Sequence, residues 1–150
     1  MRRVLAGVLA CVFAISANAS LAQDKPPLKL GGILDMSSLY ADITGSGSET
    51  AAKMAAEDFG GAVLGRKIEI VVGDHLNKAD LSANIARDMI DNQGVEMIFD
   101  VAASATALAA AEIAKARGKI IMFNGPGSIR LSNEACGPYT VHYVFDTFAQ

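Results

Sequence analysis

Apolar runs of strand length alternate with longer amphipathic segments from residue 28 onward. The apolar runs cover residues 28–34, 68–72, 95–101 and 119–123, and a last one covers 139–145. Short apolar runs of this kind are typical of strands buried on both faces of a sheet. The intervening segments, at about 49–59, 79–92 and 104–116, have helical length and small or apolar residues at helical spacing. This order predicts an α/β fold with a doubly wound, mostly parallel sheet and right-handed crossovers.

Glycines and small polar residues mark the ends of the predicted helices. The pair Gly60 and Gly61 follows the first helix, and Gly94 and Gly118 follow the other two, as expected of residues that end helices. At the helix starts, Ser46 or Ser48 is expected to cap the first helix, and Asn77 or Asp80 the second. The alanines at positions 51, 52, 55 and 56 predict a first helix that packs close to the sheet.

The turn after the third predicted strand is the most informative stretch. Asp100 ends the strand, and residues 102–106 are Ala, Ala, Ser, Ala and Thr. These side chains are too small to cover the free main-chain N–H groups of the helix that follows. Such donors, with the positive end of the helix dipole, favour a carboxylate or another anion. Ligands of open α/β sheets bind beyond the carboxyl ends of the strands, so we expect Ser37, Ser38 and Tyr40 on the same rim as Ser104.

The first 22 residues are interpreted as a secretory signal peptide. Arg2 and Arg3 precede an apolar run at 4–15, and small residues at 17–19 or 20–22 offer a cleavage site. We therefore expect export to the periplasm without a membrane anchor. Cys136 is then the single cysteine of the mature chain, either a buried free thiol or one partner of a pair that this sequence does not contain.

Composition and motifs exclude several functions. The 150 residues are 51% apolar and 19% charged with a net charge of −3, which leaves no basic surface for nucleic acid. His75 and His142 are far apart and predict no metal site. The segments 45–50 and 125–127 lack the residues of dinucleotide and phosphate loops, and no nucleophile and base have triad-like order. We expect no cofactor and no enzymatic activity.

Three ordered blocks carry a resemblance to a known family. LKLGGILDMSSLYADITGSGSETAAKMAAEDFGG, VLGRKIEIVVGDHLNKADLSANIARDMIDNQGVEMIFDV and TVHYVFDTFA resemble the amino-terminal lobe of the periplasmic solute-binding proteins of branched-chain amino acid ABC transporters. The resemblance extends over residues 28–150. It implies the type I periplasmic binding protein fold, in which a ligand is clamped between two α/β lobes and delivered to a membrane permease.

The resemblance also implies a division of the chain. Residues 1–22 are the signal peptide, 23–145 an incomplete amino-terminal lobe, and 146–150 the start of the hinge and second lobe, with the hinge near 145–147. Members of this family are more than twice as long as this chain. We therefore expect the second lobe, and the strands that return to complete the first, to be missing from this sequence.

The same resemblance places the ligand-binding positions in two loops. They correspond to two groups of residues, Ala103, Ser104, Ala105 and Thr106, and Gly125, Gly127 and Ser128. Tyr40, in the loop after the first strand, is expected to stack on the ligand or cap it. Ala103 matches the first serine of the leucine-type binders, and residues 125–127 replace a common Ala-Ala-Thr, so two hydroxyl groups are absent. A hydrogen bond to a charged group contributes roughly 1.5–3 kcal/mol. Losing two such bonds should matter for a zwitterion. The expected ligand is therefore not only a branched-chain or other amino acid but also an amide, an aromatic acid or another small carboxylate.

Several alternatives remain open at the level of sequence. A ligand-sensing receptor or regulator domain shares this fold, and a secreted α/β enzyme, such as a nucleotide-dependent one, has a similar sheet. Ser104 and Thr106 could serve only as caps of their own helix, and Tyr40 could be an exposed loop aromatic.

Overall fold

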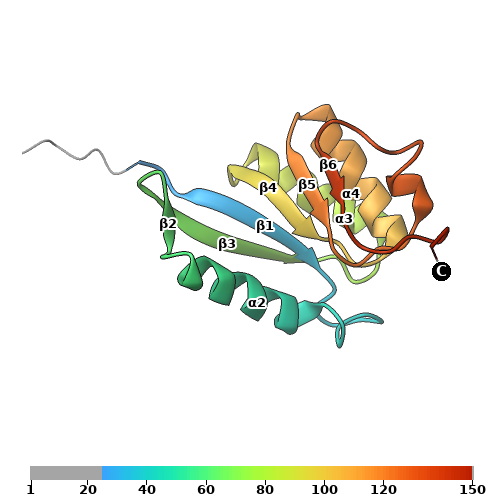
Figure 1. The fold of residues 1–150 in the computed structure, drawn as a ribbon, viewed down its shortest axis with the longest axis horizontal. Helices are drawn as coiled ribbons and strands as arrows, with labels where there is room; N and C mark the ends of the chain where they lie inside the picture. Colours follow the sequence, from blue (N-terminus) through green and yellow to red (C-terminus); the bar gives the residue numbers. More distant parts are fainter. Residues whose placement is uncertain (1–24, 150) are drawn as a thin grey trace, which may run out of the picture.

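The sheet at the centre of the protein has six strands in the order β2-β3-β1-β4-β5-β6 (Figure 1). The computed structural model describes residues 25–149, so the predicted signal peptide lies outside the described residues. The strands are β1 (Leu28–Leu34), β2 (Ala62–Val63), β3 (Arg66–Asp74), β4 (Val95–Asp100), β5 (Ile120–Phe123) and β6 (Thr140–His142). The helices are α2 (Gly45–Asp58), α3 (Ala79–Asp91) and α4 (Ser104–Ala116), with a 3-10 turn η1 (Ile129–Leu131).

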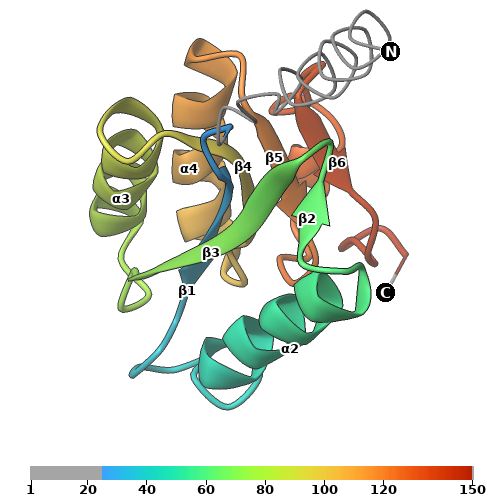
Figure 2. The same cartoon turned by 90° about the vertical axis from the view of Figure 1, so that its left-hand side faces the viewer.

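Strand pairing confirms the predicted doubly wound, mostly parallel sheet. Strands β3, β1, β4, β5 and β6 are parallel to their neighbours, and only β2 pairs antiparallel, with β3. Helices α3 and α4 lie side by side on one face, and α2 lies on the other (Figure 2). Since all the parallel strands point the same way, the loops after β1, β4 and β5 meet at one edge of the sheet.

The main core lies between the sheet and the α3–α4 layer. Its largest fully buried side chains include Ile33, Met89, Ile98, Ile121 and Phe123. The alanines of α4 at 107, 110, 111 and 114 are also buried, which lets the helix approach the sheet closely. A Cβ atom at position 73 of β3 would lie 2.6 Å from Ile85, so only glycine leaves α3 room to pack there.

The face that carries α2 is less completely covered. Gly45 is the only buried residue of this helix, and α2 packs less closely on the sheet than its alanines predict. An apolar groove remains between helix and sheet, lined by Leu30, Ala52, Ala55, Ala56, Phe59, Ile68, Ile70, Met97 and Phe99.

The predicted helix caps are wrong for both α2 and α3. Helix α2 begins at Gly45, four residues before the predicted start, so Ser46 and Ser48 lie inside it and Thr44 is its N-cap residue. Helix α3 begins as predicted at Ala79 but its N-cap residue is Lys78. Asn77 instead adopts a positive φ of 52° and donates its main-chain N–H to His75 Nδ1, which makes it part of the preceding turn.

Two strand predictions also differ from the structure. The last strand is limited to Thr140–His142, where it pairs with residues 121–123 of β5, and does not extend over 139–145. The second strand is longer than 68–72 at both ends. A hairpin, which the sequence analysis missed, adds β2 beside Arg66 and Lys67, and Gly73 and Asp74 continue the pairing with β1. Leu64 and Gly65 form its turn with φ values of 52° and 75°, a two-residue connection of the type that suits hairpins.

None of the helices formed by residues 25–149 is both long enough and apolar enough to cross a membrane.

Candidate ligand-binding site

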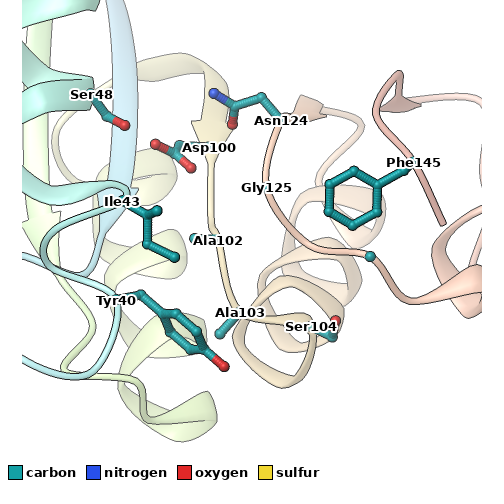
Figure 3. Close-up of a pocket in the computed structure, with 11 residues that line it drawn as sticks. Tyr40, Ile43, Ser48, Asp100, Ala102, Ala103, Ser104, Asn124, Gly125 and Phe145 are labelled. Carbon is teal, nitrogen blue, oxygen red and sulfur yellow. The ribbon is translucent and has the colours of Figure 1, made fainter. Parts of the chain in front are cut away.

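A cavity of about 400 Å³ opens at the sheet edge where the loops after β1, β4 and β5 meet (Figure 3). Its lining comes from these loops, from the first turns of α2 and α4, and from the segment after β6. The lining residues are Tyr40, Ile43, Ser48, Asp100, Ala102, Ala103, Ser104, Asn124, Gly125, Gly127 and Phe145. This is the edge at which the parallel strands present their carboxyl ends, where open α/β sheets bind ligands.

The start of α4 presents free donors at this cavity. Ala103 is the N-cap residue and, lacking a polar side chain, makes no capping hydrogen bond. The first helical bond runs from the Ala107 N–H to the Ala103 carbonyl oxygen, at 2.8 Å. No described side chain accepts the main-chain N–H groups of Ser104, Ala105 or Thr106. With the helix dipole behind them, these donors favour an anion.

Five of the eight residues predicted to bind ligand line the cavity. Tyr40, Ala103, Ser104, Gly125 and Gly127 surround it from three separate loops, and Figure 3 shows Tyr40 and Ser104 on either side of Ala103. The placement of Tyr40 and Ser104 on one rim agrees with the sequence analysis.

The other three predicted residues do not line the cavity. Ala105 is exposed on α4, and Thr106 is fully buried behind the turn, where its hydroxyl donates to the Ala103 carbonyl oxygen at 2.7 Å. Ser128 is the N-cap residue of η1, and its carbonyl oxygen accepts the Leu131 N–H at 3.1 Å. Of these three side chains, that of Thr106 makes a hydrogen bond within the start of α4.

Asp100 is a lining residue that the sequence analysis did not propose as a ligand contact. It has a φ of 73° and the next residue, Val101, a φ of 60°, both in the left-handed region that costs non-glycine residues about 1–3 kcal/mol each. Asp100 is only 2% exposed, and its Oδ2 accepts the Thr44 hydroxyl at 2.9 Å. The sequence signal was a carboxylate at the carboxyl end of a buried strand, read only as the end of that strand.

The loops after β4 and β5 touch at Gly125. A Cβ atom there would lie 2.9 Å from the Cα atom of Ala102, so the close approach requires glycine. Two residues further on, a Cβ atom at Gly127 would lie 2.9 Å from the Phe145 ring. The absence of side chains at these two positions lets Ala102 and Phe145 approach the loop after β5 closely, and all four residues line the cavity.

Asp35 holds the loop that carries Tyr40. Its fully buried carboxylate accepts the Ser38 N–H at 2.8 Å, the Ser38 hydroxyl at 2.6 Å and the Tyr40 N–H at 2.9 Å. Burial alone would raise the pKa of this carboxyl, but the hydrogen bonds from Ser38 and Tyr40 together outweigh it and lower the pKa. Asp35 therefore stays ionised and fixes Tyr40 at the rim.

His75 lies buried close enough to Asp35, Asp74 and Asp100 for their charges to act on its ring. Its Nδ1 accepts the Asn77 N–H at 2.9 Å, and its buried Nε2 has no hydrogen-bond partner. Burial lowers the pKa of the ring, against the opposing effect of the three carboxylates. The imidazole is therefore neutral at neutral pH and brings no positive charge to the acidic residues around it.

Within residues 25–149 no group of three or more His, Cys, Asp or Glu side chains is arranged to hold a metal ion. Cys136 is a free, exposed cysteine, which differs from the expected alternative of a buried thiol.

Comparison with known proteins identifies relatives of this chain. Residues 27–150 match the family described as periplasmic binding protein. A periplasmic binding protein from Burkholderia mallei is 48% identical, with a TM-score of 0.79 over 81% of this chain and 32% of its own. A branched-chain amino acid ABC transporter periplasmic ligand-binding protein from Burkholderia xenovorans is 36% identical, with a TM-score of 0.76 over 79% of this chain and 32% of its own.

A third solved structure is a solute-binding protein of an ABC transporter from Rhodopseudomonas palustris, in complex with 3,4-dihydroxybenzoic acid. It is 27% identical, with a TM-score of 0.71 over 80% of this chain and 32% of its own. The chain thus spans about a third of the length of these relatives. They are binding proteins and not enzymes, in agreement with the sequence analysis. The curated proteins contain no match to this chain.

Proposed function

The chain belongs to the periplasmic binding protein family, and we propose that it forms the amino-terminal lobe of an ABC-transporter solute-binding protein. In this proposal the cavity at the start of α4 binds a small carboxylate-bearing solute, and a second lobe closes over it. The solute is a branched-chain or other amino acid, an amide or an aromatic acid. A signal peptide at residues 1–22 directs the protein to the periplasm, where it delivers the solute to a membrane permease.

The observation that carries the proposal is the uncapped start of α4. Its N-cap residue is an alanine, and the free main-chain donors of the first turn belong to a helix that begins at the cavity wall. Each hydrogen bond from such a donor to a charged carboxylate contributes roughly 1.5–3 kcal/mol. These donors can compensate for the two hydroxyl groups that leucine-type binders have and this chain lacks.

The relatives support the ligand class. The Rhodopseudomonas palustris protein binds an aromatic acid, and the Burkholderia xenovorans protein is described as a branched-chain amino acid ligand-binding protein. Both kinds of compound carry a carboxylate, the group that suits the start of α4.

The segment predicted to be the hinge is connected to the cavity. Phe145 lines the cavity, and the Thr147 N–H donates to the Gly127 carbonyl oxygen at 2.7 Å. The Ile129 N–H also donates to the Thr147 hydroxyl, at 3.3 Å. A solute that contacts the loop at Gly127 therefore acts on the segment 145–147, around which we propose that the two lobes close.

A pair of substitutions at Ser104 tests the proposal in the full-length protein. Proline is well tolerated at the first position of a helix, and Ala103 already has the extended backbone that precedes proline, with φ −86° and ψ 135°. Ser104→Pro should therefore fold normally and remove one main-chain donor. We expect its affinity for the bound carboxylate, measured by calorimetry, to fall about tenfold or more.

Ser104→Ala is the matched control, because it removes only the hydroxyl and keeps the N–H. We expect it to retain more affinity than Ser104→Pro. If Ser104→Pro binds as tightly as the unmodified protein, the carboxylate does not sit at the start of α4 and the proposal is wrong.

A further inference from the structure

The Asp100 carboxylate is a buried negative charge in the wall of the same cavity. The residue is 2% exposed yet belongs to the lining, and Figure 3 shows its carboxylate between Ser48 and Ala102. A carboxylate in such a place requires hydrogen-bond donors or a positive charge, because the buried charged form is costly without them.

The described part of the chain satisfies this carboxylate only in part. Oδ2 accepts the hydroxyl of Thr44, itself 3% exposed. Within residues 25–149 no hydrogen bond to Oδ1 is found, and the four ion pairs of this region involve other residues. His75, the nearby histidine, is neutral, as described above. Oδ1 is therefore available as a strong acceptor at the cavity.

The cavity consequently has two ends of opposite character. The start of α4 at Ser104 offers donors to an anion, and Asp100, four residues earlier, offers an acceptor. A simple carboxylate satisfies the first end and leaves the second unpaired. A ligand that carries a hydrogen-bond donor in addition to its carboxylate can satisfy both.

From this juxtaposition we propose that Asp100 is a ligand-binding residue that selects acids carrying an amine or hydroxyl donor over the same acids without one. The inference rests on the proposed function and adds to it the residue that binds the amine or hydroxyl donor of the ligand. A protonated amine makes the stronger partner, because its charge is opposite to that of the carboxylate.

Matched pairs of acids test this in the full-length protein. We would measure by calorimetry the affinities of leucine against isocaproate, which is leucine without its amino group, and of 3,4-dihydroxybenzoate against benzoate. At least one donor-bearing acid should bind about tenfold or more tightly than its partner. This comparison needs no variant, so it stands even if substitutions at Asp100 disturb folding.

Asp100→Asn then assigns the selectivity to this residue. The amide keeps an acceptor oxygen but loses the charge, so a preference for leucine should fall about tenfold, whereas a preference for the dihydroxy acid should fall less. Asp42→Asn is the matched control: it removes an exposed carboxylate of the loop between β1 and α2, and Asp42 does not line the cavity. It should leave both preferences unchanged.

The outcomes separate the inference from the proposed function. If both members of each pair bind with equal affinity, the cavity binds carboxylates but Asp100 does not select among them, and the inference alone is wrong. It is equally wrong if a folded Asp100→Asn protein keeps the full preference. If none of these acids binds, the proposed function fails and the inference fails with it.

Discussion

Gly125 lies where the loop after β5 crosses the turn that leads into α4. A Cβ atom there would lie 2.9 Å from the Ala102 Cα atom, and main-chain atoms cannot move aside cheaply. We expect Gly125→Ala to lower the free energy of unfolding by about 1–3 kcal/mol. Urea unfolding of the full-length protein measures this change.

Gly47 is the matched control for this substitution. It lies in the first turn of α2, and a Cβ atom there would meet nothing within 4 Å. Gly47→Ala should therefore raise the free energy of unfolding by about 0.5–1 kcal/mol. Equal effects of the two substitutions would mean that the loop contact at Ala102 does not constrain Gly125.

His75 makes stability depend on pH. Burial lowers its pKa in the folded protein below the ordinary 6.5, so below about pH 6.5 the unfolded chain takes up a proton that the folded protein does not. The free energy of unfolding should therefore fall as the pH is lowered from about 7.5 to about 5.5. The glutamine of His75→Gln cannot titrate, so the free energy of unfolding of this variant, measured with urea, should fall less over the same pH interval.

The carboxylates beside His75 do not cause a change in the free energy of unfolding over this pH interval. Asp35 and Asp74 also have lowered pKa values, from an ordinary 3.8, so the stability that they contribute is lost only at more acidic pH. If His75→Gln loses as much stability as the unmodified protein over the same interval, the buried ring is not the source of the pH dependence.

Individual site residues could be predicted from the sequence only where the main chain determines their place. Tyr40 and Ser104 follow parallel strands, and the carboxyl ends of those strands share one edge. The role of Thr106 could not be predicted, because whether a side chain points into a cavity or behind a turn depends on the exact start of α4. Asp100 was not predicted to be a site residue because the sequence does not indicate a left-handed backbone, here with φ 73°, at a residue other than glycine.

At the level of elements, periodicity located the parallel strands and the α-helices of residues 25–149 but not all of their ends. The first strand has the predicted bounds, Leu28–Leu34, because a mostly apolar stretch begins after two prolines and ends at Asp35. The start of α2 was misplaced because Thr44 acts as N-cap residue without a capping side-chain bond. Its hydroxyl instead binds Asp100, in a strand 56 residues away, and such long-range contacts lie outside any local pattern.

The hairpin β2–β3 shows a different limit. Its turn contains an exposed leucine, Leu64, at a positive φ of 52°, where hairpin turns normally have asparagine, aspartate or glycine. Only Gly65 marked the turn. Tertiary placement of the two strands therefore overrides the local preference of Leu64, and turn chemistry alone could not identify this element.

For the whole molecule, we predict closure around the bound acid. If the full-length protein has two lobes that clamp the ligand, saturation should shift it from an open to a closed state. Small-angle X-ray scattering should then give a smaller radius of gyration with ligand than without it. Ser104→Pro, at a ligand concentration that saturates only the unmodified protein, should stay open, and identical profiles with and without ligand would contradict a hinge near 145–147.

We propose that the start of α4 holds the carboxylate of a small solute. A crystal structure of the full-length protein with its tightest-binding acid tests this most directly. We predict a carboxylate oxygen within about 3.2 Å of the main-chain nitrogen of Ser104. A ligand whose carboxylate is held elsewhere, with the first turn of α4 still unoccupied, would contradict it.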